Sequence, residues 1–195
     1  MPSHDHSAMA LLLGLAVLFG CCANSKGPGG SAEVALAPDV HAALPANWKV
    51  LPSTLGNVVT LGREKDGALV ARATAMREPR TDHAEAVRRL AEVAKERPGD
   101  RTFLALCGWP ALERRFSAAQ KRPEGPAGKP FQPVLSAVDT LEIVIAAESA
   151  LFYLRAESPG DPAALDEVAA LARALRCPRN PHPERTAADL QTLTD

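Results

Sequence analysis

The segment from Thr102 to Cys107 carries apolar side chains in both of its alternating sets of positions. Successive side chains of a β-strand point to opposite faces, so a strand of this kind must be covered on both sides. Gly108, Trp109 and Pro110 end the apolar run. The chain is therefore expected to build a β-sheet with further layers on both faces, rather than a sheet with one face open to water.

Other segments predict the remaining strands of this sheet. Asp66-Gly67 separates two apolar runs and is typical of a tight hairpin turn. Glu148-Ser149 separates two further runs that are rich in β-branched and aromatic residues, which favours strands. Strands are expected at 48–51, 57–63, 68–76, 111–117, 138–147 and 150–155, with a loop rich in proline and glycine at 120–133.

Two segments have the pattern of amphipathic helices. The first covers 82–96 and begins with a capping box in which Asp82 takes the role of Ser or Thr. The second covers 161–176, with Asp161 at the N-cap and Pro162 at the first helical position. Their buried faces are expected to carry Ala84, Val87, Leu90, Ala91 and Ala94 in the first helix, and Leu165, Val168, Leu171, Ala172 and Leu175 in the second.

Hairpins interrupted by helices predict an α+β fold, an antiparallel sheet with a helix on each face. A length of 195 residues fits one domain with tails. The domain is expected to span 45–178. The segment 21–44 has the composition of a flexible linker, and 179–195 is expected to be a C-terminal tail with one helical turn near 187–193.

The N-terminal region contains an uncharged apolar run at 8–23. Sixteen helical residues span about 24 Å, which is shorter than the roughly 30 Å hydrocarbon core of a bilayer. A flexible stretch rich in Gly and Ser follows at 24–31. This arrangement favours a signal peptide at 1–20 and an exported protein, while a buried core helix or an uncleaved anchor remains the alternative.

The end of the apolar run, Leu18-Phe19-Gly20-Cys21, resembles the lipobox of bacterial lipoproteins. That resemblance implies that Cys21 is diacylated and becomes the first residue of a membrane-anchored protein. Phe19 is bulkier than the usual residue, and no Lys or Arg occurs in 1–10. Ordinary cleaved secretion is therefore a second alternative. His4 and His6 fall in the part that would be removed, so they are not expected to bind metal.

Two cysteines, Cys107 and Cys177, lie in the expected domain. An exported chain meets an oxidising compartment, so a disulfide between them is reasonable, with two separate buried thiols as the alternative. Closing the loop between them would stabilise the fold by about 4 kcal/mol on the chain-entropy account. The sequence has no Cys or His spacing typical of a zinc site, and no cofactor is expected.

Catalytic patterns are absent from the sequence: it has no dinucleotide-binding glycine motif, no P-loop, no nucleophile elbow and no zinc-protease helix. A nucleophilic Cys107 would need a histidine base, and after export only His41, His83 and His182 remain. The remaining candidates are a dispersed carboxylate site made from Glu113, Asp139 and Glu142, and an anion site at Arg88-Arg89 or Arg114-Arg115. All of these are expected to be solvated surface charges.

The order of strands and helices resembles the PsbP-like fold and the DcrB-type bacterial lipoproteins. The resemblance rests on Trp48 in the first strand, the Asp66-Gly67 hairpin, the helix 82–96, the break at 107–111 and the closing helix 161–176. It covers about residues 46–177. The resemblance implies an α/β/α sandwich with an accessory or binding role, and it supplies no functional residues.

The expected function is that of a non-catalytic accessory protein, lipid-anchored and facing the periplasm or the cell exterior, which binds an unknown envelope protein. A small-ligand carrier and a hydrolase with a dispersed carboxylate site are the alternatives. Lys and Arg number 22 against 23 Asp and Glu, which gives a net charge of −1. Nucleic-acid binding is not expected, because such proteins usually carry a strong basic excess.

Lipidation of Cys21 can be tested by metabolic labelling with a fatty acid. The label should enter the wild-type protein and be absent from Cys21→Ser, because the acylated thioether needs the cysteine sulfur. Cys22→Ser is the matched control and should label normally. Equal labelling of wild type and Cys21→Ser, or no labelling of either, would contradict the prediction.

Overall fold

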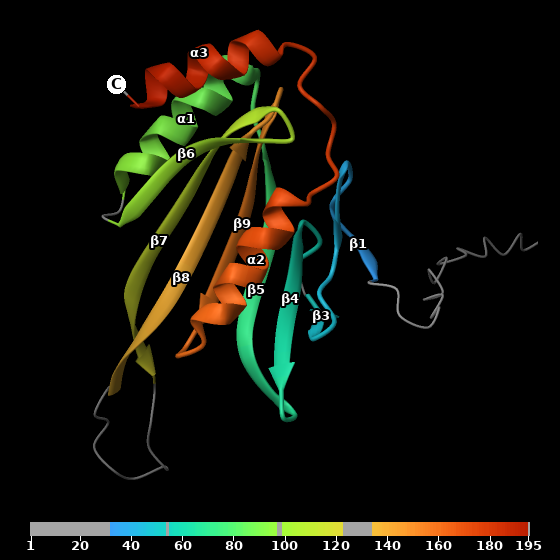
Figure 1. Ribbon diagram of the computed structural model, residues 1–195, viewed down its shortest axis with the longest axis vertical. Helices are drawn as coiled ribbons and strands as arrows, with labels where there is room; N and C mark the ends of the chain where they lie inside the picture. Colours follow the sequence, from blue (N-terminus) through green and yellow to red (C-terminus); the bar gives the residue numbers. More distant parts are fainter. Residues whose placement is uncertain (1–31, 54, 97–98, 123–133, 195) are drawn as a thin grey trace, which may run out of the picture. The chain divides into compact units, whose positions relative to one another are not determined.

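The computed structural model describes residues 32–53, 55–96, 99–122 and 134–194. Within them a seven-stranded antiparallel sheet has the order β3-β4-β5-β9-β8-β7-β6, and β1 and β2 form a separate two-stranded sheet (Figure 1). The strands are β1 Glu33–Ala37, β2 Val40–Ala43, β3 Trp48–Leu51, β4 Val58–Lys65, β5 Ala68–Pro79, β6 Asp100–Leu106, β7 Trp109–Arg122, β8 Val134–Ala146 and β9 Ala150–Ser158. The helices are α1 His83–Glu96, α2 Pro162–Arg173 and α3 Pro183–Thr194.

The predicted antiparallel α+β fold is confirmed, and its hairpins explain the strand order. At the β4–β5 turn, Asp66 and Gly67 have φ angles of 52° and 79°, and at the β6–β7 turn Cys107 and Gly108 have 55° and 78°. Two consecutive residues with positive φ give the tight turn whose twist matches a hairpin. Because α1 follows β5, the chain leaves the sheet there, and β9 returns to pair with β5.

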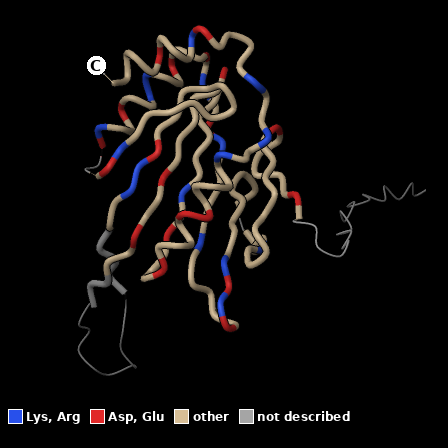
Figure 2. Tube along the Cα trace, in the orientation of Figure 1, with Lys and Arg blue, Asp and Glu red and all other residues tan. Residues whose placement is uncertain are grey.

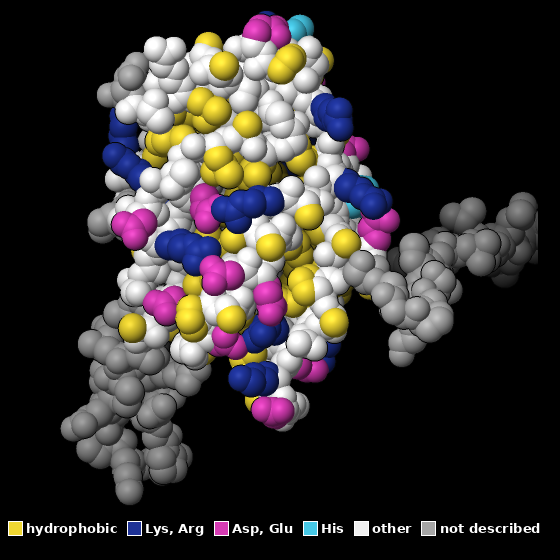
Figure 3. All heavy atoms as spheres, viewed as in Figure 1, with side chains coloured by type: hydrophobic (Ala, Val, Ile, Leu, Met, Phe, Trp, Pro, Cys, Tyr) yellow, Lys and Arg dark blue, Asp and Glu magenta, His cyan; other side chains and the backbone are white. Residues whose placement is uncertain are grey.

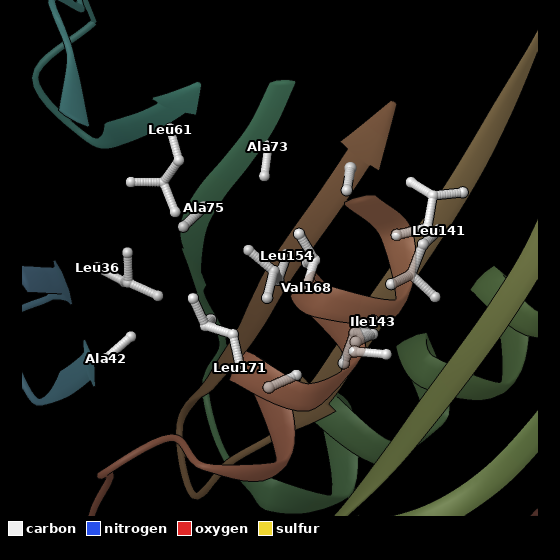
Figure 4. Close-up of a cluster of buried hydrophobic side chains, with 14 of the residues drawn as sticks. Leu36, Ala42, Leu61, Ala73, Ala75, Leu141, Ile143, Leu154, Val168 and Leu171 are labelled. Carbon is white, nitrogen blue, oxygen red and sulfur yellow. The ribbon is translucent and has the colours of Figure 1, made fainter. Parts of the chain in front are cut away.

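Helices α1 and α2 contact alternate residues of the same strand. Val144 and Ala146 of β8 pack in the cluster that contains α1, whereas Ile143 and Ile145 pack in the cluster that contains α2. Alternate residues of a strand face opposite sides of a sheet. The α2 side is shown in Figure 4, where Val168 and Leu171 lie over the side chains of the strands.

The apolar face of α2 agrees with the sequence prediction, and that of α1 is rotated from it. Leu165, Val168, Leu171 and Ala172 are buried in α2. In α1 the buried residues are Ala86, Leu90, Val93 and Ala94, while Ala84 is exposed. An alanine stripe does not define one face sharply, because small side chains contribute little buried area. The larger Leu90 and Val93 therefore set the orientation of the helix.

Residues 32–44, predicted as the end of a linker, are instead part of the folded domain. They form the β1–β2 hairpin, whose Leu36, Ala42 and Leu44 are buried in the core beneath α2. The backbone of His41 exchanges two hydrogen bonds with that of Arg176, 2.8 and 2.9 Å long. The prediction was wrong here because short, alanine-rich strands resemble a linker in composition. Their packing partners outside the hairpin lie in β4, β5 and α2, so no neighbouring residue in the sequence indicates them.

The segment predicted as a C-terminal tail contains the complete helix α3, which packs against β6 and β7. A polar network holds its start. Thr186 accepts a hydrogen bond from the side chain of Asn180 and donates one to the backbone carbonyl of Gly108, 2.5 Å away. The sequence indicated only one turn, because α3 is a weakly amphipathic helix that buries Thr186 rather than a row of large apolar residues.

Cys107 and Cys177 form a disulfide, with 6.0 Å between their Cα atoms. The bond ties the β6–β7 turn to the segment that follows α2. Trp109 reinforces the same connection, since its indole nitrogen donates a hydrogen bond of 2.9 Å to the carbonyl oxygen of Pro178. The β6–β7 turn and the segment that follows α2 are thus held together.

Arg63 of β4 links the edge of the sheet to α2. Its guanidinium donates two hydrogen bonds of 2.9 Å to Glu167 and one of 2.5 Å to Asp161. The indole nitrogen of Trp48 donates a further bond of 2.7 Å to Glu167. Asp161 therefore occupies the predicted N-cap position of α2 but pairs with Arg63 instead of capping the helix. In α1 the predicted cap is confirmed, because Asp82 accepts a hydrogen bond from the backbone of Glu85.

Several sequence predictions fall outside the described residues. They include the signal peptide at 1–20, Cys21 with the first part of the linker, and most of the loop at 120–133. The strands beside that loop are longer than predicted, since β7 runs to Arg122 and β8 starts at Val134. None of the helices in the described part of the chain is long and apolar enough to cross a membrane.

A buried ion pair lies between β7 and β8 on the α1 side. The side chain of Arg114 is 1% exposed and pairs with Glu142, which is 11% exposed. Arg114 also donates a hydrogen bond of 2.7 Å to the carbonyl oxygen of Val93 in α1. The pair therefore connects two strands and a helix, and neither charge has enough water around it to be stable alone.

We expect Glu142→Gln to lower the free energy of unfolding by about 3 kcal/mol, because it leaves the Arg114 charge buried without a partner. Glu64→Gln, which breaks an exposed pair with Lys49, should cost less than about 1 kcal/mol. Urea unfolding of the full-length chain measures both. The double variant Arg114→Met with Glu142→Leu should recover most of the loss. Equal costs for the two single variants would contradict this account.

Candidate functional site

A pocket of about 230 Å³ opens at the end of the sheet where β5 stops and β8 turns into β9. Its apolar interior includes Trp109, Ile145 and Phe152, which are 6%, 3% and 4% exposed. The β1–β2 turn and the segment after α2 complete its walls. The pocket therefore depends on two segments, 32–44 and 177–178, that sequence analysis placed at or beyond the domain boundary.

Trp109 is held firmly in the pocket. It is the first residue of β7, its indole nitrogen bonds to Pro178, and its ring contacts the imidazole of His83 with 5.4 Å between ring centroids. The adjoining disulfide fixes Cys177, which is also a lining residue. The pocket is thus largely pre-formed, which is typical of small-molecule sites.

Three exposed charged residues, Arg77, Asp39 and Glu148, also line the pocket. Arg77 comes from the end of β5, Asp39 from the β1–β2 turn and Glu148 from the β8–β9 turn. No ion pair or side-chain hydrogen bond joins any of the three to another residue in the described part of the chain. Charged groups around an apolar interior are the arrangement that binds a ligand with a polar end and an apolar end.

A second pocket of about 400 Å³ shares Arg77 with the first. It lies between β1 and the start of β4, and its other lining residues are uncharged: Ala35, Leu36, Ala37, Pro38, Gly56, Asn57 and Val59. The Arg77 guanidinium therefore borders both spaces. A ligand bound to Arg77 from either side would meet apolar surface next to it.

His83 is engaged on both sides of its ring. Nδ1 lies 3.2 Å from the carbonyl oxygen of Ala147, and Nε2 lies 2.7 Å from the carboxylate of Asp189 in α3. The imidazole thus connects α1, the end of β8 and α3. Both ring nitrogens therefore have partners within the fold, and the disulfide leaves Cys107 without a thiol. The other two candidate histidines, His41 and His182, lie in β2 and directly before α3.

The three candidate carboxylates do not come together. Glu142 pairs with Arg114 on the α1 side, while Glu113 pairs with Arg173 of α2 at 2.7 Å. Asp139 accepts a hydrogen bond of 2.7 Å from Ser117, which is four residues from Glu113 along β7. Four residues of strand span roughly 13 Å. That separation is too long for the two-carboxylate chemistry of known hydrolases.

The adjacent arginine pairs do not form anion sites either. Arg114 and Arg115 point to opposite faces of β7, where Arg115 pairs with Asp166 of α2 at 2.8 Å. In α1, Arg89 pairs with Glu92 and Glu96 at 3.1 and 2.7 Å. Figures 2 and 3 show basic and acidic residues interleaved along the strands and over the surface in view. Within the described ranges, no group of three or more metal-binding side chains gathers.

Tyr153 of β9 is an ionisable group that sequence analysis did not consider. It packs at the edge of the α1 cluster, where burial raises its pKa to about 12 and the carboxylate of Glu78 adds to the rise. A phenol with this pKa stays protonated at neutral pH. Tyr153 therefore packs against the α1 cluster as a neutral phenol.

Sequence analysis also missed all three charged residues of the pocket, Arg77, Asp39 and Glu148. Each lies at a strand end or in a turn, where a charge carries no specific signal. Trp109 was noted only as part of a break between strands. The available signal was the Pro38-Asp39 turn between two short apolar runs, which predicts a hairpin when it is not assigned to a linker.

No protein-family model matches the sequence, and no curated protein matches it. Among solved structures, the fold is similar to that of a Bacteroides thetaiotaomicron protein, with a TM-score of 0.54 and 8% identity over 77% of this chain. The chain spans half the length of that protein. LpqN of Mycobacterium tuberculosis, described as involved in cell envelope biogenesis, is similar with a TM-score of 0.46 and 16% identity, over 74% of this chain and 88% of LpqN.

At 8% identity the similarity to the Bacteroides protein shows the fold alone. Neither structure is described as a PsbP-like or DcrB-type protein, so that resemblance remains a prediction from the layout of the sequence.

The pKa of Tyr153 can be measured directly, because it is the single tyrosine of the chain. Phenolate absorbance should titrate near 12 in the folded protein and near 10 in denaturant. Since the folded-state pKa is the higher one, the stability that the buried phenol contributes is complete below pH 10 and is lost as pH rises toward 12. Glu78→Gln should lower the folded midpoint, whereas Glu64→Gln should not. A folded midpoint at the denatured value would contradict the burial of Tyr153.

Proposed function

We propose that this chain is an exported, lipid-anchored protein of the cell envelope that acts by binding and not by catalysis. The observation that carries the proposal is the contrast between two sets of side chains. The catalytic candidates named from the sequence, among them Glu113, Glu142 and His83, are engaged in internal contacts, whereas the lining of an apolar pocket keeps three unpaired charges. A rigid pocket without a free nucleophile–base pair supports recognition.

Two features support the exported location. The uncharged run ending in Gly20-Cys21 has the pattern of a lipoprotein signal. The Cys107–Cys177 disulfide is the kind of bond that persists in an oxidising compartment and is rare in the cytosol. The partner of the protein is then a component of the envelope, either a protein or a ligand that the pocket takes up.

The pocket favours a small-ligand carrier as a second candidate function. Its interior is apolar and buried, which suits a molecule withdrawn from water better than it suits a protein surface. A carrier needs the pocket to be open, whereas an assembly factor does not. A change that fills the pocket should abolish the function of a carrier, while an assembly factor should tolerate it.

Rescue of a deletion strain tests the proposal. We expect loss of the protein to increase the sensitivity of cells to detergent, and expect Glu113→Gln, Asp139→Asn and the wild type to restore resistance. Cys21→Ser should fail to restore it, because the protein would no longer be anchored. The level and lipid labelling of each variant serve as controls.

Two outcomes would contradict the proposal. Failure of Glu113→Gln or Asp139→Asn at normal stability, level and labelling would indicate an enzyme with a carboxylate site. An unchanged detergent sensitivity in the deletion strain would argue against a role in the envelope. Filling the pocket with Ala147→Leu separates the two binding functions, since only a carrier should lose activity.

A further inference from the structure

The pocket between the β1–β2 and β8–β9 turns carries both signs of charge. Arg77 is its one basic lining residue, and Asp39 and Glu148 are its acidic ones. Elsewhere in the described structure, arginines such as Arg63 and Arg173 form ion pairs with the acids near them. In the described part of the chain Arg77 forms no ion pair with either acidic lining residue, so these exposed charges are available to a ligand in the pocket.

The signs of these charges restrict the ligand. A plain anion would be attracted by Arg77 and repelled by two carboxylates, and a plain cation would meet the opposite problem. A head group that carries both charges gives every charged group of the lining a partner. Guanidinium groups bind phosphate through paired hydrogen bonds, and carboxylates accept hydrogen bonds from a primary ammonium.

The interior of the pocket requires an apolar part in the same ligand. Trp109, Ile145 and Phe152 are almost completely buried, and Val40, Ala150 and Pro178 complete an uncharged surface around them. A head group alone would leave the accessible part of this lining, chiefly Val40 and Pro178, in contact with water. Burying an aliphatic chain against it is favourable in proportion to the apolar area removed from water.

We propose that the pocket binds a zwitterionic amphiphile with a phosphate and a primary ammonium in its head group, as in a phosphoethanolamine lipid. The phosphate pairs with Arg77, the ammonium with Asp39 and Glu148, and the aliphatic chain lies on Trp109 and Phe152. This inference rests on the proposed function, because a lipid-anchored protein is held beside such lipids. It adds the class of ligand.

Other clusters in the molecule do not carry a ligand. Arg63 has its hydrogen bonds filled by Glu167 and Asp161, and the His83 ring is held between Ala147 and Asp189. The pocket at Arg77 differs from both because its charged side chains have no partner among the described residues, while its apolar surface is already assembled.

Calorimetric titration of the full-length protein, kept in solution with an amphipol, tests the inference. The probes are short-chain lysophospholipids below their micelle concentrations. Lysophosphatidylethanolamine should bind about tenfold more tightly than lysophosphatidylglycerol, which has no ammonium, because one charge-assisted interaction is worth roughly that factor. Lysophosphatidylcholine should also bind more weakly, since its quaternary ammonium has no N–H to donate. Free phosphoethanolamine should bind at least about tenfold more weakly than the lipid, because it has no chain to bury.

Variants assign each part of the ligand to its partner. Arg77→Gln should weaken binding of all three phosphate-bearing lysolipids by about tenfold. Asp39→Asn combined with Glu148→Gln should remove the preference for the ethanolamine head group and retain binding of the glycerol one. Arg72→Gln and Asp66→Asn are the matched controls, since both residues are exposed and lie outside the pocket, and they should change nothing. All five substituted positions are exposed, so folding should be unaffected, and thermal unfolding checks this.

Several results would overturn the inference. They are equal affinity for all head groups, tighter binding of the glycerol lipid, binding of free phosphoethanolamine as tightly as the lipid, or no binding of any probe. If these occur in protein that is labelled at Cys21 and restores detergent resistance, the ligand class is wrong and the proposed function stands. If labelling and rescue also fail, the proposed function is itself contradicted.

Discussion

Strand β8 is buried on both faces, and the arrangement of the other elements follows from this constraint. All six residues from Leu141 to Ala146 are buried. Alternate members of this run pack into the separate clusters that contain α1 and α2. A strand of this kind needs a neighbour on each edge and a layer on each face. Strands β7 and β9 pair with the two edges of β8, and helices α1 and α2 pack against its two faces.

The same constraint determines where charge is tolerated. Glu142 is the one ionisable residue in the buried run, and it is stabilised by Arg114 on the neighbouring strand. Glu113 and Asp139 lie on the α2 side, where each has a polar partner. Charges near the core thus stabilise the contacts between elements, while the pocket lining, formed by turns, can keep unpaired charges exposed to water. The pocket with unpaired charged groups therefore lies at the end of the sheet.

The pocket forms where segments distant in the sequence meet. The β1–β2 hairpin, the end of β5, the β8–β9 turn and residues 177–178 each contribute one part of its lining. The disulfide and the Trp109–Pro178 hydrogen bond fix residues 177–178 against the β6–β7 turn and the start of β7. Cys107 has a positive φ angle that is uncommon for residues other than glycine, and its disulfide partner follows α2. The disulfide thus joins the β6–β7 turn to Cys177, a lining residue of the pocket.

The sequence by itself determined the local structure of this protein. The Asp66-Gly67 turn, the Asp82 cap, the Pro162 start and the stripe of Leu165, Val168 and Leu171 depend on neighbours within a few residues, so their patterns predict them. Only the tertiary structure showed that 32–44 forms a hairpin and that 179–195 contains a helix. It also placed Arg77, Asp39 and Glu148 around one pocket. Alanine-rich strands and a weakly amphipathic helix gain their stability from distant partners, and no local pattern records those contacts.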